Sequence, residues 1–260
     1  MKVLGISPLD KDATVSIVED GTILYAAGEE RFSRKKQQDG FPAIAINKAL
    51  EYTGLTLKDI DVVCYPFLTS ENEKKLINQN LEDEKEFLAN FKVAELKPLI
   101  KEALTKVPNR ADSIHGLKNP NEMMEKGILH NTFYRLSGTE SVLSNIASTK
   151  GSKQWAASAE ESFQKWENAL EAGLKKAGFD GKVKRMDHHL THAANAFLTS
   201  GYKKALCITL DGYGSGLAGS VSEGVDGKIK RLHGVKFPNS LGSLYEHVTS
   251  SLGFKPSRHE

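Results

Sequence analysis

Residues 205–235, ALCITLDGYGSGLAGSVSEGVDGKIKRLHGV, carry the main architectural signal because they repeat the order of elements with which the chain opens. Residues 3–27, VLGISPLDKDATVSIVEDGTILYAA, show the same order without the long glycine-rich loop. In this first copy, strand patterns cover residues 3–6, 13–18 and 22–27. A helix pattern follows each copy, at 43–52 and within 240–254. An internal repeat of this kind is strong evidence on architecture.

Three strands and a helix, with a polar loop after the first strand, are the repeated plan of the two-lobed actin, Hsp70 and sugar-kinase (ASKHA) architecture. In that plan the paired loops face each other across a cleft that holds nucleotide phosphates. The sequence therefore predicts an α/β protein with an ASKHA fold. We expect the first lobe at residues 1–68 and 153–202, a helical insert at 69–152 and the start of the second lobe at 203–260. Either the rest of that lobe lies beyond the given sequence or another chain supplies it.

Further secondary structure can be assigned between the two copies. Strands are predicted at 61–65 and 183–186, and an amphipathic helix at 157–177. The insert is rich in lysine and glutamate, and its helical pattern is broken at Pro98, Pro108 and Asn119-Pro120. Trp155 and Trp166 follow the insert and are expected to pack the returning helix.

Bulk properties exclude several classes of protein. The 260 residues carry a net charge of +2 with mixed signs, so no basic face predicts a nucleic-acid partner. No segment approaches the roughly 18 apolar residues of a membrane span, and the first residues lack a signal-peptide pattern. Cys64 and Cys207 lie in apolar strand patterns, where reduced core cysteines are expected. We expect a cytoplasmic protein.

The segment 187–192, DHHLTH, is the strongest candidate for a metal site. Asp187 is a good helix N-cap for a helix from His188 to about residue 198. His188 and His192 then lie one turn apart on one face and can direct ring nitrogens at a single cation. An ordinary surface histidine pair is the alternative.

The glycine-rich run 211–216, DGYGSG, is a candidate phosphate loop. Gly212, Gly214 and Gly216 would let the backbone approach an anionic group closely. Taken alone, the run predicts a glycine-rich hairpin loop, and phosphate contact is the less favoured alternative.

Five groups of segments together resemble the O-carbamoyltransferases of nodulation-factor and antibiotic biosynthesis. They are LGIS, DAT and EDG within 4–21, GEERFSRKK and FP within 28–42, DHHLTHAANAF at 187–197, ITLDGYG at 208–214, and LGSLYEHVTSSLGFKP at 241–256. Each is weak alone, but their order and spacing together are specific. The catalytic domain of these enzymes is similar to the universal tRNA threonylcarbamoyl-transfer protein.

The resemblance implies a divalent metal bound by His188, His192 and Asp211, with a further aspartate expected downstream. Iron is implied, with manganese or zinc as alternatives. Two imidazoles and carboxylates suit these ions and leave open positions for phosphate or carbamoyl oxygens.

The resemblance also implies the reaction. A YrdC-like domain makes carbamoyl adenylate from ATP and carbamoyl phosphate, and the actin-like domain transfers the carbamoyl group to a small biosynthetic intermediate, with AMP leaving. We expect the activity to be incomplete in this chain alone. The insert 69–152 is expected to select the acceptor, which is a hydroxyl or an amine.

The first loop departs from the family pattern at Lys11, where a histidine usually precedes Asp12. Either Asp12 removes the acceptor proton, or Lys11 does so with a lowered pKa, or the substitution reflects an amine acceptor, a different acyl-type donor or weakened catalysis. The alternative is that Lys11 binds a phosphate or substrate acid. The connector 29–36 matches the family motif, and Arg31, Arg34 and Lys36 are candidate anion contacts; a structural salt-bridge network is the alternative.

Three other classes of protein remain open. The chain could be an actin-like nucleotide-binding module without transfer chemistry, or a partner subunit whose other half comes from another chain. A metallohydrolase is disfavoured, because no glutamate lies between His188 and His192 to act as a base as in HExxH proteases.

Overall fold

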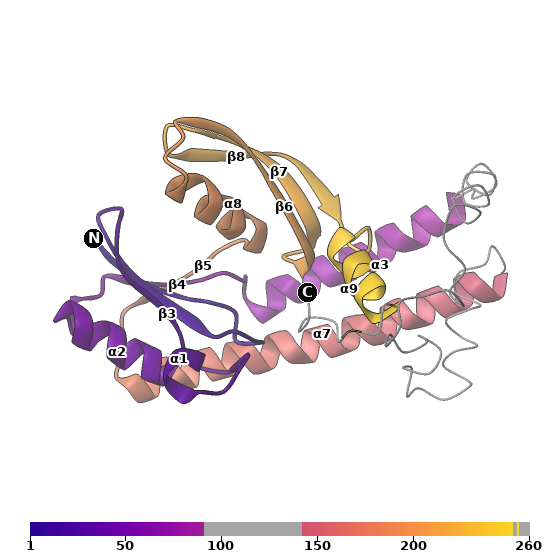
Figure 1. The fold of residues 1–260 in the computed structure, drawn as a ribbon. Helices are drawn as coiled ribbons and strands as arrows, with labels where there is room; N and C mark the ends of the chain where they lie inside the picture. Colours follow the sequence, from indigo (N-terminus) through magenta and orange to yellow (C-terminus); the bar gives the residue numbers. More distant parts are fainter. Residues whose placement is uncertain (91–141, 252–253, 255–260) are drawn as a thin grey trace, which may run out of the picture.

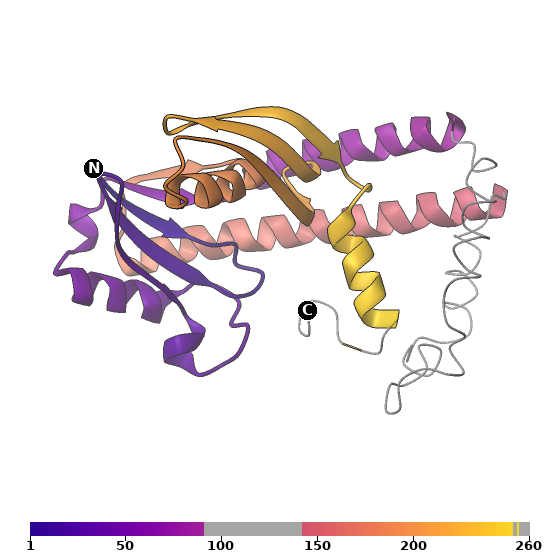
Figure 2. The same cartoon turned by 45° about the horizontal axis from the view of Figure 1, so that its top comes forward.

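A computed structural model describes residues 1–90, 142–251 and 254 of the chain (Figure 1). These residues form two β-sheets and helices around them, so the predicted α/β class is confirmed. Helix α8 (His188–Thr199) lies between the two sheets in both views (Figures 1 and 2). No helix in the described ranges combines the length and apolar character needed to cross a membrane.

The first sheet has five strands in the order β3-β2-β1-β4-β5. They are β1 (Lys2–Ile6), β2 (Thr14–Glu19), β3 (Thr22–Gly28), β4 (Val62–Tyr65) and β5 (Lys182–Arg185). The first three pair antiparallel, whereas β4 pairs parallel with β1 and β5 parallel with β4. Asp20 and Gly21 turn the chain at φ 47° and 86°, as a type I′ hairpin requires. The predicted meander is confirmed within a mixed sheet.

The second sheet repeats the three-stranded antiparallel arrangement. It consists of β6 (Lys204–Gly214), β7 (Leu217–Val225) and β8 (Lys228–Lys236) in that order. β6 continues past its predicted end at residue 210, because Gly214 pairs with Leu217 across a turn formed by Ser215 and Gly216 at φ 48° and 80°. The predicted loop 211–216 is therefore the end of a strand and a hairpin turn.

Two long helices, α3 (Ser70–Asn90) and α7 (Val142–Ala177), pack together and run outward from the sheets (Figures 1 and 2). Helix α7 starts at Val142, so the prediction of a helix beginning at residue 157 was wrong. Gly151 lies inside this helix, where a glycine costs about 1 kcal/mol relative to alanine but is tolerated. The predicted breaks at Pro98, Pro108 and Asn119-Pro120 lie outside the described residues.

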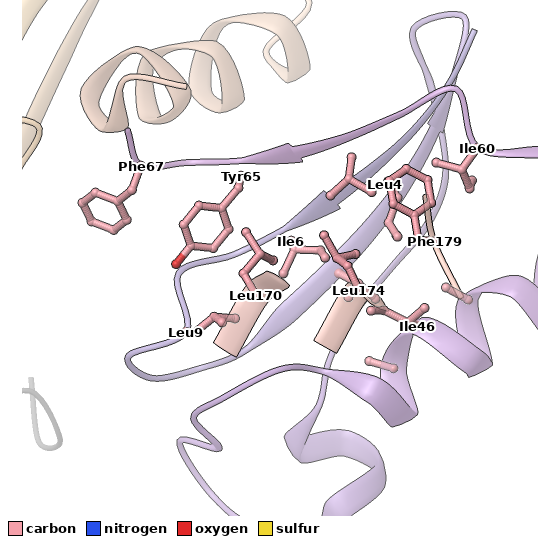
Figure 3. Close-up of a cluster of buried hydrophobic side chains, with 14 of the residues drawn as sticks. Leu4, Ile6, Leu9, Ile46, Ile60, Tyr65, Phe67, Leu170, Leu174 and Phe179 are labelled. Atoms are coloured by element: carbon pink, nitrogen blue, oxygen red, sulfur yellow. The ribbon is translucent and has the colours of Figure 1, made fainter. Parts of the chain in front are cut away.

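The main core lies between the first sheet and the helices α2 (Ala43–Thr53) and α7 (Figure 3). Leu4 and Ile6 on β1 alternate with residues of the opposite face, which is the period of a strand. Its labelled members in Figure 3 are Leu4, Ile6, Leu9, Ile46, Ile60, Tyr65, Phe67, Leu170, Leu174 and Phe179. A smaller cluster, which includes Phe197 of α8 and Cys207 of β6, joins α8 to the second sheet.

The tryptophans and cysteines fill structural positions, as predicted. Trp155 stacks on Phe237 with ring centroids 4.1 Å apart, and Trp166 packs edge-on against Phe163 at 5.2 Å. Cys64 and Cys207 are free thiols, partly and fully buried respectively.

Candidate metal centre

Three side chains meet where the start of α8 approaches the end of β6. Nε2 of His188 lies 2.6 Å from Oδ2 of Asp211 and 3.0 Å from Nε2 of His192. Nε2 of His192 lies 3.5 Å from the same carboxylate oxygen. One ligand atom from each residue falls within a spacing of 4.8 Å, which is compatible with a single metal ion. The structure thus brings together the three residues predicted as metal ligands.

Asp187 fixes the start of α8, as predicted. It has extended backbone angles, and its Oδ1 accepts a hydrogen bond of 2.8 Å from the backbone N–H of Leu190. Arg231 of β8 pairs with the same carboxylate. Because the helix begins at His188, that residue and His192 lie on consecutive turns of one face.

Three groups orient His188 from outside the cluster. Its Nδ1 lies 3.1 Å from the carbonyl oxygen of Pro66, and its ring stacks on Phe67 with centroids 4.4 Å apart. Its backbone N–H donates to Oγ of Ser215 over 3.2 Å. Because the carbonyl oxygen of Pro66 can only accept, Nδ1 of His188 carries the proton and donates this hydrogen bond. The bond leaves Nε2 facing the cluster, and proteins usually orient a metal-binding histidine in this way.

Electrostatics at the cluster favour a positive charge. Burial lowers the pKa of His188, but the neighbouring Asp211 outweighs burial and the pKa is raised. Burial likewise opposes ionisation of Asp211, yet hydrogen bonds from His188 and His192 hold its pKa well below the usual range. Two ring nitrogens and a carboxylate oxygen at this spacing repel one another unless a proton or a metal ion lies among them.

The buried side chain of Glu73, in the first turn of α3, was not predicted as part of the site. Oε1 accepts hydrogen bonds from Leu68 N–H at 3.1 Å and Ser215 Oγ at 2.9 Å, and Oε2 accepts one from Tyr213 at 3.2 Å. The Ser-x-x-Glu spacing from Ser70 to Glu73 is typical of a helix start. This pattern predicts an exposed capping glutamate and gives no sign that the carboxylate is buried.

The three glycines of the run 211–216 occupy different environments. A Cβ on Gly214 would lie 2.1 Å from Cδ2 of His188, so the ring packs directly on the backbone of β6. Gly216 is one of the two left-handed residues of the turn, with Ser215. A Cβ on Gly212 would meet nothing within 4 Å, and the N–H of Gly212 donates to Oδ1 of Asp211 over 2.7 Å. Packing and turn geometry explain two of the glycines; phosphate contact stays a prediction.

The first loop, between β1 and β2, exposes Lys11 and Asp12 to solvent. Asp12 is in the left-handed region at φ 51°, and its carbonyl accepts a hydrogen bond of 2.7 Å from Thr14. The neighbouring Asp10 was not predicted. This residue is exposed, yet desolvation by nearby protein atoms raises the pKa of its carboxyl group.

The basic connector forms a local ion-pair network around Glu30. Lys36 and Arg31 lie 3.2 and 3.8 Å from Oε1 of Glu30, and both are mostly exposed. Arg34 ends the short helix α1 (Glu30–Ser33) in the left-handed conformation. Helices α1 and α2 lie across the first sheet from α8 in both views (Figures 1 and 2). The contacts match the salt-bridge alternative; anion binding by the three basic residues stays a prediction.

Glu29 has a structural role that the motif did not reveal. It is buried, and its two carboxylate oxygens accept hydrogen bonds from the N–H groups of Ile44 and Ala45, at 3.1 and 2.7 Å. These N–H groups belong to the first turn of α2, which has no side-chain cap of its own. Part of the motif therefore anchors a helix.

Known proteins share sequence similarity with nearly the whole chain. A family described as the carbamoyltransferase N-terminus matches residues 2–260. An uncharacterized protein of Synechocystis is 25% identical over 264 residues, which cover 99% of this chain and 33% of that protein. The nodulation protein NolNO of Sinorhizobium fredii is 26% identical over 243 residues, which cover 94% of this chain and 25% of that protein.

A shorter match joins the chain to the nodulation protein NolO of Bradyrhizobium diazoefficiens, with 40% identity over 70 residues, or 26% of this chain and 12% of that protein. The chain spans a third or less of the length of these relatives. The resemblance expected from five groups of short segments is confirmed by the family match, and the chain belongs to the carbamoyltransferase N-terminus family.

Proposed function

We propose that this chain is part of a carbamoyltransferase that moves a carbamoyl group from carbamoyl adenylate to a hydroxyl or amine of a small biosynthetic intermediate. Family membership supports the transfer class. The observation that carries the proposal is the convergence of His188, His192 and Asp211 between the two sheets. A nucleotide-binding module without transfer chemistry would have no use for this cluster.

The cluster fits a divalent metal by its donor chemistry. Two imidazole nitrogens and one carboxylate oxygen suit iron, manganese or zinc. Because Nδ1 of His188 donates a hydrogen bond to Pro66, Nε2 is the ring nitrogen that can bind the metal. We propose iron, with the other two ions as alternatives. When bound, the ion supplies a Lewis acid that stabilises negative charge developing on a phosphate or carbonyl oxygen.

The exposure of the three side chains suggests where substrate oxygens approach. His188 is 9% exposed, Asp211 34% and His192 52%. His188 therefore forms the inner wall of the site, and His192 borders solvent. Asp211 balances positive charge at the cluster.

The transfer itself needs a nucleophile, a base and a leaving group. The acceptor oxygen or nitrogen forms a bond to the carbamoyl carbon, the bond from that carbon to the phosphate oxygen breaks, and AMP leaves with the electron pair. A base must take the acceptor proton, and Lys11 or Asp12 is proposed for that role, with phosphate binding as the alternative for Lys11. Gly212, Gly214, Gly216 and the basic residues Arg31, Arg34 and Lys36 are proposed contacts for the nucleotide phosphates.

We further propose the two-lobed ASKHA fold, with the divisions 1–68 plus 153–202, 69–152 and 203–260. The shared strand order supports it, because both sheets contain three consecutive strands in chain order, β1-β2-β3 and β6-β7-β8. The two sheets differ at the first strand of each set. β1 also pairs with β4, whereas its counterpart β6 is an edge strand in the described residues. Leu206, Ile208 and Leu210 on β6 are 62%, 64% and 59% exposed. A second lobe completed by further polypeptide would cover these side chains, and the adenylate would come from a YrdC-like domain.

A transfer assay tests the proposal. The whole protein is purified, its bound metal is measured, and AMP release from ATP and carbamoyl phosphate is followed with a panel of hydroxyl and amine acceptors. AMP release that depends on one acceptor, and is lost in the double variant His188→Ala with His192→Ala, supports the proposal. Metal content unchanged in that variant would refute the assigned site. Lys11→Ala should reduce transfer more than adenylate binding.

A further inference from the structure

Glu73 is a fully buried carboxylate close to the proposed metal centre. It is 0% exposed, although glutamate is rarely buried without a specific partner. None of the lysine or arginine side chains in the described parts of the chain forms an ion pair with it. Its partners are instead the three neutral donors of Leu68, Tyr213 and Ser215.

These donors belong to two segments that lie far apart in the sequence. Leu68 follows β4 in the connector 66–68, and Tyr213 and Ser215 belong to the hairpin between β6 and β7. One carboxylate therefore joins the end of the first sheet to the hairpin of the second sheet, and α3 carries it.

The same two segments hold His188 on opposite sides. The connector supplies the carbonyl of Pro66 and the ring of Phe67. The hairpin supplies Ser215, whose Oγ accepts from the backbone N–H of His188 and donates to Glu73, and it also carries Asp211. A shift of either segment would change the distance from Nε2 of His188 to the carboxylate of Asp211.

We infer that Glu73 is a positioning residue for this centre, holding connector and hairpin at the spacing that directs His188 Nε2 at Asp211. The inference rests on the proposed function only in naming a metal as the ligand. Partners outside the ligand set typically contribute about 10- to 100-fold to metal affinity. We expect a loss of this size when Glu73 is removed.

The test uses Co²⁺ as the metal and the chain with Glu73→Ala, Glu73→Gln or Glu71→Ala. Glu71 is the matched control, because it lies on the same turn of α3 but its side chain is 78% exposed and pairs with Lys75. Glu73→Gln keeps the shape and an acceptor oxygen, so it should restore much of the affinity. Circular dichroism checks folding, and the visible spectrum of bound Co²⁺ reports the ligand geometry.

A second readout needs no metal. The imidazole ¹⁵N resonances of His188, assigned with His188→Ala, report its hydrogen bonds directly. Glu73→Ala should shift them and weaken Co²⁺ binding by about 10- to 100-fold, with an altered spectrum. Glu71→Ala should change neither.

The remaining outcomes distinguish the positioning role of Glu73 from the proposed metal site. Unchanged His188 resonances in Glu73→Ala overturn the positioning role, even if Co²⁺ binds. A wild-type chain that binds no Co²⁺ refutes the metal site, while the resonances still decide the role of Glu73. If Glu73→Ala does not fold, Glu73→Asp carries the test, because its shorter side chain withdraws the carboxylate from Tyr213 and Ser215. Unchanged His188 resonances in that variant overturn the inference.

Discussion

Replacing Gly214 by alanine should displace His188 from the cluster. An added Cβ would lie 2.1 Å from Cδ2, 2.5 Å from Cγ and 2.8 Å from Cβ of His188, all shorter than real contacts allow. The ring cannot turn away without cost, since it is stacked on Phe67 and bonded to Pro66 and Asp211. Either the ring or the strand β6 has to move.

The size of the effect follows from overpacking. Inserting a methyl group into a close contact typically destabilises a protein by about 1–3 kcal/mol. For a domain of this size each kcal/mol lowers the melting temperature by roughly 2–4 °C, so a fall of roughly 2–12 °C is expected. Because a proposed ligand moves, Co²⁺ affinity should fall at least about 10-fold.

Gly212→Ala is the matched control for both measurements. It places the same methyl group two residues earlier on β6, where nothing lies within 4 Å of the added atom. Thermal unfolding with a chelator present measures stability, and Co²⁺ titration measures affinity. Equal melting temperatures and equal affinities for the two variants would refute the argument that the backbone of Gly214 supports His188.

Three further predictions concern individual side chains. In metal-free protein, His188→Ala should lower the free energy of unfolding by about 2 kcal/mol more than His192→Ala. The reason is that the side chain of His188 is 9% exposed and that of His192 is 52% exposed. Thermal unfolding of the two variants measures the difference. Glu29→Ala should destabilise by about 1–3 kcal/mol in urea titrations, because two N–H groups of α2 lose their acceptor. The hydrogen bond from the N–H of Gln37 is the main reason why the pKa of Glu30 lies below its ordinary value of 4.5. The stability that Glu30 contributes is therefore present above pH 4.5 and is lost as the pH falls through its folded-state pKa. Glu30→Gln should therefore lower the urea midpoint at pH 7 and match wild type in strong acid; an equal difference at both pH values would contradict this.

Much of the architecture and part of the site were predictable because short-range interactions encode them. The Asp20-Gly21 turn admits the positive φ values of a tight hairpin, and the alternation around it defines strands. Asp187 caps its helix through a bond to a residue three positions later. The spacing of His188 and His192 then follows from helix geometry alone.

Other features required the tertiary structure, because they depend on segments that only the folded chain brings together. Asp211 was proposed from the family resemblance, but its contact with His188 depends on α8 packing against β6. Glu73 reads locally as an ordinary helix start, and its bonds to Tyr213 and Ser215 span 140 and 142 residues.

The sequence by itself determined the α/β class, the repeated meander, the histidine pair and the family, since local backbone preferences and ordered motifs are sufficient for these. The tertiary structure alone decided that Gly214 supports His188, that Glu29 anchors α2 and that the carboxylate of Glu73 is buried. Burial and close approach depend on which surfaces meet, and a local pattern of residues does not specify that.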